Sequence, residues 1–468
     1  MSSPAAAAPQ LLRLLAQWLP AQRWYAAGPR PPALVPAAKP DPLAAGPARV
    51  WVLVLRDTAA QPPVTYQVPV VDRPAARAGA DGALVGVFED PDLGRRWLYD
   101  GPHDPAYVAE LVGCVVATGE SAPTVRCTFS RVLVGEQSNT SVICEVTGPG
   151  GVPLDPVIVK VFRTLAPGDN PDVEVCRTLG AAGSRLVPRW RGDAELAWVG
   201  PDGAPVRGYA HVATSFLAGS EDAWRSALRA AGQGRSFATE ARELGAMSAA
   251  LHAQLAASFG TRAAGAPDRA RVLDALRQRY AAAVERVPEL SADAIDIRAI
   301  LDGVGELTWP PLQRVHGDYH LGQVLRTSHG WVALDFEGEP LRPAAERTHP
   351  DLPERDVAGM LRSFDYAAGS IEHDRPELSR RDWAQDARSA FLAGYRGAAS
   401  TPTRHANRDH DAWVRAFEVD KALYEIAYEA THRPTWLPIP RGALDRLLLA
   451  TRSTVGLDAP HTARSPIP

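Results

Sequence analysis

The sequence has 468 residues, of which 46% are hydrophobic and 22% charged, and its formal net charge at pH 7 is -4. A chain of this length is too long for a single hydrophobic core, so two or three domains are expected. The near balance of charge argues against a nucleic-acid-binding protein, which usually carries a basic surface.

The remaining composition is typical of a cytoplasmic protein. The cysteines Cys114, Cys127, Cys144 and Cys176 form no Cys-x-x-Cys pair, which favours reduced thiols over a metal or redox site. The start of the chain lacks the pattern of a signal peptide, and no run of about 18 apolar residues predicts a membrane span. Lysine is scarce beside arginine, so a lysine inside an apolar segment is a candidate for a functional role.

The first 110 residues are expected to form a small domain of strands and helices. Leu11–Leu19 has apolar residues at helical spacing and ends before Pro20, which predicts a short amphipathic helix. Gly28–Pro47 is rich in Pro, Gly and Ala and is expected to be a loop. Strands are then predicted at Val50–Leu55, Val64–Val71 and Ala83–Phe88, and a helix near Pro105–Thr118.

Residues 111–217 predict a second strand-rich domain. Asn170 and Pro171 are typical of a helix start, as a capping residue followed by proline at the first helical position. Strands are predicted at Thr124–Val134, Val142–Val146, Val157–Phe162 and Val206–Phe216. From about Ala223 the pattern becomes helical, with long stretches at 237–258 and 269–303. Strands up to residue 217, followed by helices over 218–468, predict a two-lobed α+β architecture.

The segment Gln313–Gln323 carries the clearest functional pattern. It contains Val-His-Gly-Asp and then Tyr-His-Leu-Gly-Gln, so Asp318 and Gln323 are five positions apart. This spacing matches the Asp-x-x-x-x-Asn of kinase catalytic loops, in which the Asp accepts the hydroxyl proton and the amide oxygen reaches Mg²⁺. The strand Trp331–Asp335 then presents a second carboxylate before Phe-Glu-Gly.

A lone His-Gly-Asp is more often a turn with a capping aspartate. The addition of Gln323 and Asp335 favours a catalytic loop in which Asp318 is the base and the other two side chains hold Mg²⁺. The pattern therefore predicts phosphoryl transfer from ATP.

Two further groups are expected to bind the nucleotide. Lys160, in an apolar strand, fits the lysine that neutralises the α/β-phosphates and pairs with a helix glutamate, here Glu174. The alternative is that both side chains lie on solvated faces. In the turn Gly135–Ser141, the polar residues Ser138, Asn139 and Thr140 can donate hydrogen bonds to phosphate oxygens, unless the turn is a plain β-hairpin.

These segments resemble the bacterial maltokinases, which share the two-lobed fold of the aminoglycoside phosphotransferases and the eukaryotic-like kinases. The resemblance covers most of the chain and is closest at 313–326, 334–340 and 355–365. Trp-Leu-Pro-Ala-Gln-Arg-Trp-Tyr at 18–25 is typical of the extra N-terminal cap. Asp-Lys-Ala-Leu-Tyr-Glu at 420–425 and Arg-Pro-Thr-Trp-Leu-Pro-Ile-Pro at 433–440 also match.

The resemblance implies phosphorylation of the anomeric hydroxyl of maltose, which gives maltose 1-phosphate and ADP within α-glucan (glycogen) synthesis. Asp318 would be the base, Gln323 and Asp335 the Mg²⁺ ligands, and Lys160 the phosphate-binding lysine. The expected fold is α+β and aminoglycoside phosphotransferase-like. It has a cap subdomain at 1–110, an ATP-covering N-lobe at 111–217 and a helical C-lobe with the sugar site at 218–468.

A sugar site is expected to combine polar side chains for the hydroxyl groups with an aromatic platform for the ring. The C-terminal part supplies such a set: His320, Arg355, Asp356, Tyr424, Glu425, Tyr428 and Trp436. Structural alternatives are core packing for the residues of the Tyr/Glu helix and the tryptophan, and a hydrogen bond within the catalytic loop for His320. Arg355 and Asp356 can instead pair with each other or anchor that loop.

Two other functions stay open. One is a related kinase for another acceptor, such as glucosamine or an aminoglycoside, although a polycation needs a more acidic cleft than the balanced pair Arg355 and Glu425 provides. The other is a non-catalytic partner of another enzyme of trehalose or glucan metabolism. The four intact residues Lys160, Asp318, Gln323 and Asp335 argue against that reading.

Overall fold

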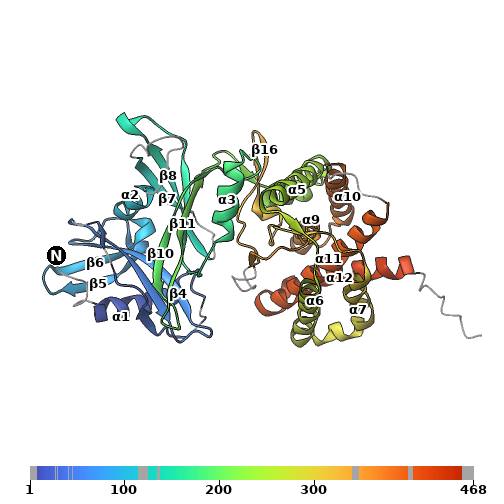
Figure 1. The fold of residues 1–468 in the computed structure, drawn as a ribbon, viewed down its shortest axis with the longest axis horizontal. Helices are drawn as coiled ribbons and strands as arrows, with labels where there is room; N and C mark the ends of the chain where they lie inside the picture. Colours follow the sequence, from blue (N-terminus) through green and yellow to red (C-terminus); the bar gives the residue numbers. More distant parts are fainter. Residues whose placement is uncertain are drawn as a thin grey trace, which may run out of the picture. The chain divides into compact units, whose positions relative to one another are not determined.

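The computed structural model describes residues 8–26, 28, 30–40, 42–44, 46–113, 125–133, 138–339, 347–398 and 404–455. The chain divides into two compact units, Met1–Ala218 and Gly219–Pro468, each of which is described by itself. The first unit is built mainly from strands and the second mainly from helices (Figure 1).

Helix α1 (Ala8–Trp18) opens the first unit and packs on an antiparallel sheet, as the apolar spacing predicted. Leu15 in the helix and Leu19 just after it are fully buried against sheet residues that include Leu53 and Leu98. The sheet has the order β1-β3-β4-β6-β5, with β2 beside β3. Its strands are β1 (Leu34–Pro36), β2 (Pro42–Ala44), β3 (Arg49–Asp57), β4 (Val64–Arg73), β5 (Leu84–Asp90) and β6 (Gly94–Asp100).

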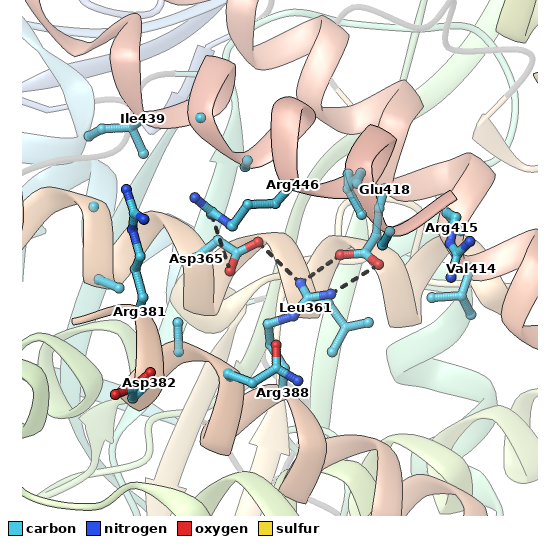
Figure 2. A pocket seen from close by; sticks show the side chains of 18 of the residues that line it. Leu361, Asp365, Arg381, Asp382, Arg388, Val414, Arg415, Glu418, Ile439 and Arg446 are labelled. Carbon is cyan, nitrogen blue, oxygen red and sulfur yellow. Dashed lines mark hydrogen bonds and ion pairs between the residues drawn. The ribbon is translucent and has the colours of Figure 1, made fainter. Parts of the chain in front are cut away.

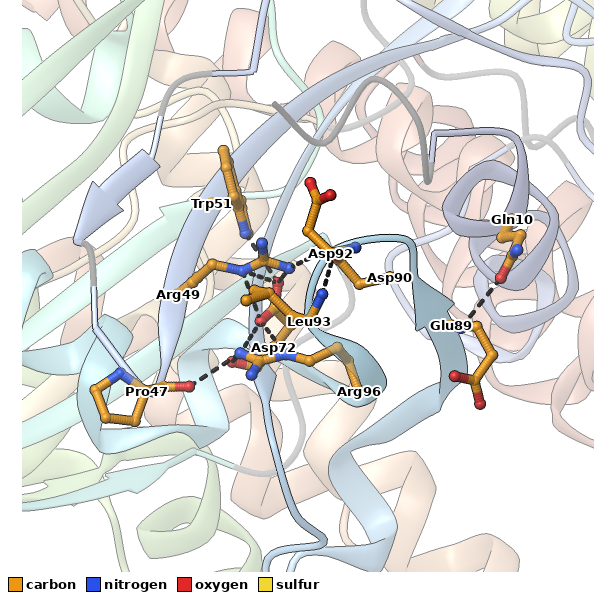
Figure 3. Close-up of polar contacts among 10 residues, drawn as sticks. All are labelled: Gln10, Pro47, Arg49, Trp51, Asp72, Glu89, Asp90, Asp92, Leu93 and Arg96. Carbon is orange, nitrogen blue, oxygen red and sulfur yellow. Dashed lines mark hydrogen bonds and ion pairs between the residues drawn. The ribbon is translucent and has the colours of Figure 1, made fainter. Parts of the chain in front are cut away.

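A buried ionic network ties four strands of this sheet together (Figure 3). Arg49 Nε donates to both carboxylate oxygens of Asp72 at 2.9 and 3.0 Å, and Trp51 Nε1 donates to Asp72 at 3.2 Å. Arg96 Nε donates to Asp72 at 3.0 Å, while Arg49 Nη2 donates to Asp90 at 2.8 Å. Each buried carboxylate thus has a guanidinium partner, which the low polarity of its surroundings requires.

The second sheet has the order β10-β11-β9-β8-β7. Helix α3 (Pro171–Ala181) lies between β9 and β10 in the chain, and Asn170 caps the helix as predicted, since its side chain accepts hydrogen bonds from the backbone N–H groups of Asp172 and Val173. Helix α2 (Pro105–Gly113) precedes the sheet and is shorter than the predicted Pro105–Thr118, whose last residues lie outside the described ranges. The strands are β7 (Arg126–Val132), β8 (Asn139–Thr147), β9 (Val157–Phe162), β10 (Trp190–Val199) and β11 (Pro205–Ser215).

Side chains from both sheets join within the first unit. Gln67 on β4 donates to the carbonyl oxygens of Phe162 and Ala210 at 3.1 and 2.9 Å. The buried guanidinium of Arg163 donates to Asp100 at 2.7 Å. The predicted boundary between residues 110 and 111 therefore lies inside one compact unit, and the separation into a cap and an N-lobe stays a prediction.

The second unit is a helical assembly with small strands around the segment Gln313–Asp335. Helices α5 and α10 pack so closely that only glycine fits at Gly245 and Gly394. A Cβ added at either position would lie 2.0 Å from a carbonyl oxygen of the other helix. None of the helices in the described ranges is long and apolar enough to cross a membrane. The helices are α4 (Ala223–Gln233), α5 (Ala238–Phe259), α6 (Ala266–Arg286), α7 (Ala294–Gly303), α9 (Glu354–Asp374), α10 (Arg381–Ala398), α11 (Arg404–His432) and α12 (Pro438–Val455). The strands are β12 (Glu221–Asp222), β13 (Thr261–Arg262), β14 (Leu312–Gln313), β15 (Val324–Thr327) and β16 (Gly330–Ala333).

Candidate active site

The segment predicted to be a catalytic loop runs from β14 to β15, and a short 3-10 turn at Leu321–Gln323 closes it. Gly317 has a φ of 86°, a backbone conformation that glycine adopts without strain. A Cβ at this position would also come within 3.3 Å of Gly338 Cα. The loop therefore needs glycine between His316 and Asp318.

Asp356, near the start of α9, holds this loop from behind. Its two oxygens accept the backbone N–H groups of His316 and Gly317 at 2.7 and 2.9 Å. Its Oδ2 also lies 3.1 Å from His252 Nε2, and the residue is only 1% exposed. Burial acts to raise the pKa of Asp356, but the hydrogen bond and charge of His252 outweigh it and lower the pKa. Asp356 therefore anchors the loop, which is one of the alternatives given for it above, and its contact with a sugar stays a prediction.

Asp318 is paired with a lysine that the sequence analysis had not assigned to the site. Lys421 Nζ, on α11, donates to Asp318 Oδ1 at 3.0 Å. Burial acts to raise the pKa of Asp318, but the charges of Lys421 and His320 outweigh it and lower the pKa to about 2. For Lys421, burial is likewise outweighed by the charges of Asp318 and Glu339, which raise its pKa. Both groups are therefore ionised at neutral pH.

Two histidines in the loop have defined tautomers. His320 Nδ1 accepts the backbone N–H of Gly322 at 3.0 Å, so the proton of the neutral ring is on Nε2, which lies 4.0 Å from Asp318 Oδ2. Burial lowers the pKa of His320, which favours this neutral form. His316 Nδ1 is next to the backbone N–H of Asp318, and its Nε2 donates to the Leu334 carbonyl at 2.8 Å. The sequence left His320 between a sugar contact and a loop hydrogen bond, and the second is present.

Gln323 and Asp335 come together as the motif spacing predicted. Gln323 Nε2 donates to Asp335 Oδ2 at 3.0 Å, across the antiparallel pair β15 and β16. Asp335 has a φ of 62°, the one positive φ of a non-glycine residue in the described ranges. Such backbone strain is concentrated at functional sites, because the surrounding structure must stabilise it.

In the first unit, Lys160 lies on β9 and its Nζ is 3.1 Å from Asp172 Oδ2, in the first turn of α3. Glu174, the partner that the sequence predicted, lies two residues further on in the same helix, and its backbone N–H bonds to the Asn170 carbonyl at 3.0 Å. The ion pair of Lys160 with Asp172 was missed by sequence reasoning, although both acidic residues stand in the same first turn, and the pairing of Lys160 with Glu174 stays a prediction.

The polar turn before β8 is only partly described, since residues 134–137 lie outside the described ranges. Ser138 is exposed and its hydroxyl lies 3.2 Å from Asn139 Nδ2. The Thr140 hydroxyl accepts a hydrogen bond from the buried Arg163 Nε at 2.8 Å. Thr140 is thus bonded within the protein, whereas Ser138 lies at the surface of its unit.

The acidic side chains predicted for the sugar site, and their neighbours, are paired with cations. Arg279 Nη2 donates to both oxygens of Glu339 at 3.0 Å. Arg355 pairs with Asp351 at 2.9 Å and with Asp420 at 3.2 Å, and not with its neighbour Asp356. A second set links Arg362 Nη2 to Glu425 at 2.6 Å. The predicted residues Arg355 and Glu425 are therefore members of ion pairs between α9 and α11.

The predicted aromatic residues form two groups. Tyr424 and Tyr428 stack with their ring centroids 6.2 Å apart on α11, and Lys421 Nζ lies 5.0 Å from the Tyr424 ring. Trp436 stacks on Tyr366 of α9 with centroids 6.2 Å apart. All three predicted aromatic residues are half-buried, so each keeps some exposed ring surface. Only Tyr424 is linked to Asp318 through Lys421.

A separate cavity of about 660 Å³ lies among helices α9 to α12 of the second unit (Figure 2). Asp365 and Glu418 both accept hydrogen bonds from Arg388, at 3.1 and 2.6 Å. Five arginines and five carboxylates line it, so its charge is balanced. None of the residues predicted for catalysis or sugar binding is among the described residues that line it.

Comparison with known proteins identifies two families along the chain. The maltokinase N-terminal cap domain matches residues 18–104, and the phosphotransferase enzyme family matches residues 193–406. A glucosamine kinase from Streptacidiphilus jiangxiensis is 28% identical over 366 residues, which are 74% of this chain and 77% of that protein. A glucosamine kinase from Mycolicibacterium smegmatis is 35% identical over 168 residues, which are 35% of this chain and 42% of that protein.

The fold is also that of solved kinases. A glucosamine kinase in complex with glucosamine, ADP and inorganic phosphate is 25% identical, with a TM-score of 0.62, and the match covers 93% of this chain and 98% of that one. Another crystal form of a glucosamine kinase has a TM-score of 0.60 at 23% identity, with 94% and 99% covered. These likenesses confirm the predicted α+β fold of the aminoglycoside phosphotransferase type. The chain is therefore a phosphotransferase with an alcohol group as acceptor: residues 193–406 match the phosphotransferase enzyme family, and residues 18–104 match the cap domain of the maltokinases, which the chain resembles.

Proposed function

We propose that this protein transfers the γ-phosphoryl group of ATP to a hydroxyl group of a neutral sugar, and that the sugar is maltose, which gives maltose 1-phosphate and ADP. The observation that carries the proposal is the pairing of three carboxylates, those of Asp318, Glu339 and Glu425, with cations of the same unit. An acceptor that bears an ammonium group would need a carboxylate whose charge is not already neutralised.

The pairs are specific, and their side chains are at least half-buried. Asp318 has Lys421, Glu339 has Arg279, and Glu425 has Arg362. A carboxylate in such a pair keeps lone pairs for the hydroxyl groups of a sugar, and a guanidinium keeps N–H donors for its oxygens. The set therefore suits an uncharged polyhydroxylated acceptor better than a polycation.

The catalytic roles follow from the same side chains. Asp318 orients the acceptor hydroxyl and takes its proton when the new P–O bond forms and the bond to ADP breaks. Lys160 neutralises the phosphates of ATP. The donor set of Gln323 and Asp335 fits Mg²⁺, because an amide and a carboxylate offer the oxygen ligands that this hard cation prefers, and the Gln323 amide lies against Asp335, with its Nε2 3.0 Å from Oδ2. Bound there, Mg²⁺ would neutralise charge on the phosphates.

A second candidate is a glucosamine kinase. It is favoured by the names of the relatives, one of which is 28% identical across 74% of this chain. The protonated amino group of glucosamine would lie beside carboxylates that already have cationic partners, which disfavours this acceptor. The place of the reaction in glucan synthesis, and any partner enzyme there, stay predictions.

A coupled assay of ADP release with ATP, Mg²⁺ and a panel of acceptors tests the proposal. The panel is maltose, glucose, glucosamine, N-acetylglucosamine and kanamycin, with a reaction without acceptor as the blank. We expect kcat/KM for maltose to exceed that for glucosamine by at least tenfold, since a charged amine must be desolvated without a free counter-charge. A product phosphorus signal that couples to the anomeric proton identifies the hydroxyl. A higher kcat/KM for glucosamine would overturn the choice of a neutral sugar.

A further inference from the structure

We propose that Lys421 is a positioning residue for phosphoryl transfer, whose ammonium group holds the Asp318 carboxylate in the orientation that receives the acceptor hydroxyl. This inference rests on the proposed function of Asp318 and adds to it a residue from a helix 103 positions further along the chain. Lys421 is one of only three lysines in the sequence, beside Lys39 and Lys160.

The contact leaves one carboxylate oxygen available. Lys421 Nζ donates to Asp318 Oδ1 at 3.0 Å, while Oδ2 lies 4.0 Å from His320 Nε2, beyond hydrogen-bond distance. A carboxylate held at one oxygen cannot rotate freely about its Cβ–Cγ bond. Its other oxygen is therefore fixed in direction, as the acceptor of a substrate hydroxyl must be.

The ammonium group is itself held in place. Its side chain is 25% exposed, and the Tyr424 ring centroid lies 5.0 Å from Nζ. The preceding residue, Asp420, pairs with Arg355 at 3.2 Å, and Arg355 pairs with Asp351 at 2.9 Å. These contacts fix the turn of α11 that carries Lys421.

The same chain of contacts ends at the start of the catalytic loop. The backbone groups of Asp351 and Gln313 exchange two hydrogen bonds, at 2.8 and 3.0 Å. Two consecutive residues of α11 thus connect to the loop at two points: Asp420 through Arg355 and Asp351 to Gln313, and Lys421 directly to Asp318. An ion pair that served stability alone would not need to include the base.

The chemistry is compatible with a strongly paired base. In the transfer, the acceptor oxygen bonds to the γ-phosphorus, the bond from phosphorus to the ADP oxygen breaks, and the hydroxyl proton goes to Asp318. Because the transition state is loose, the proton leaves late, and orientation of the hydroxyl matters more than the basicity of the carboxylate. Holding the carboxylate still then contributes more than a free but mobile base would.

A double-mutant cycle tests whether Lys421 acts through Asp318. The variants are Lys421→Met, Asp318→Asn and the double variant, with Lys421→Arg as the conservative change and Lys39→Met, at an exposed lysine, as the matched control. We expect Lys421→Met to lower kcat at least tenfold with less than a twofold change in KM for ATP. Lys421→Arg should retain more activity than Lys421→Met, and Lys39→Met should equal the wild type.

In the Asp318→Asn background, Lys421→Met should change kcat by less than twofold, because its partner is already neutral. Thermal unfolding of each variant separates folding from catalysis. If Lys421→Met alone is unstable, two other variants remain measurable. The double variant leaves no unpaired charge, and Lys421→Arg keeps a cation beside Asp318. The inference would be overturned by a wild-type kcat in Lys421→Met. It would also be overturned if adding Lys421→Met to Asp318→Asn lowered kcat by a further tenfold. A wild type that phosphorylates no sugar would instead overturn the proposed function.

Discussion

His252 Nε2 lies 3.1 Å from Asp356 Oδ2, while the other ring nitrogen of His252 lies 2.8 Å from the Tyr395 hydroxyl. The carboxylate that anchors the catalytic loop is therefore itself oriented by a buried side chain of α5. These contacts place a layer of buried polar side chains behind Asp318, each of them at most 8% exposed.

Asp356→Asn should disturb catalysis through the loop. Asparagine keeps one acceptor oxygen, so one of the two backbone N–H groups of His316 and Gly317 loses its charged partner. We expect a loss of about 1–3 kcal/mol in the free energy of unfolding, since a buried donor is left unsatisfied. We also expect kcat to fall at least tenfold through displacement of Asp318. Urea unfolding followed by fluorescence, together with steady-state kinetics, measures both effects. Wild-type kcat in a stably folded variant would contradict the anchoring role.

Asp318→Asn tests the base directly. The amide is close to the same size but cannot accept the hydroxyl proton, so we expect kcat to fall by on the order of 100-fold or more. The KM for ATP should change little, because Asp318 is assigned to the acceptor and not to the nucleotide. Steady-state kinetics with each substrate varied in turn separates the two parameters. Unchanged kcat would remove Asp318 from the mechanism.

Asp335→Asn should act on the metal requirement. It replaces a carboxylate beside Gln323 with a neutral amide, so we expect a higher Mg²⁺ concentration for half-maximal rate, by about tenfold or more. Titration of Mg²⁺ at fixed ATP in the coupled assay measures this value. Asp382→Asn, at an exposed residue on α10, serves as the control for removal of one negative charge. An unchanged Mg²⁺ requirement would count against Asp335 as a ligand.

How much the sequence predicts depends on whether the signal is local. Mainly apolar runs such as Val157–Phe162 predicted strands that form, whereas β10 has mixed polarity, so its pattern gave no strand prediction. In the same way, Asp318 and Gln323 lie in one short motif. Lys421 is brought to Asp318 only by the packing of α11, although the scarcity of lysine was a signal that could have marked it.

Asp356 shows the converse limit. Its place in a segment typical of the family marked it as important, but a motif does not distinguish a side chain that faces the substrate from one that faces the backbone behind it. That difference is set by burial and by three hydrogen bonds across 39 to 104 residues of sequence. Side-chain roles of this kind require the tertiary structure.

We expect the folded protein to lose stability in mild acid because of the buried side chain of His211. It lies on β11 between β9 and β10, is 7% exposed, and its Nε2 has no hydrogen-bond partner among the described residues. Burial lowers the pKa of His211 to about 4, and the charge of Asp193 offsets this only in part. In the unfolded chain the group titrates near its ordinary pKa of 6.5.

The sign of the effect follows from where the proton binds. Between pH 6.5 and 4 the unfolded chain binds a proton that the folded chain does not, so stability falls as the pH is lowered through this window. From pH 7.5 to pH 5 the contribution of His211 should be about 2 kcal/mol of unfolding free energy. His211→Gln, which does not titrate, should lack this part of the acid sensitivity. His329→Gln, at an exposed histidine in the turn between β15 and β16, should behave as the wild type. Denaturant unfolding of the three proteins at both pH values measures the difference, and equal pH dependence of His211→Gln and wild type would show that His211 is not the group responsible.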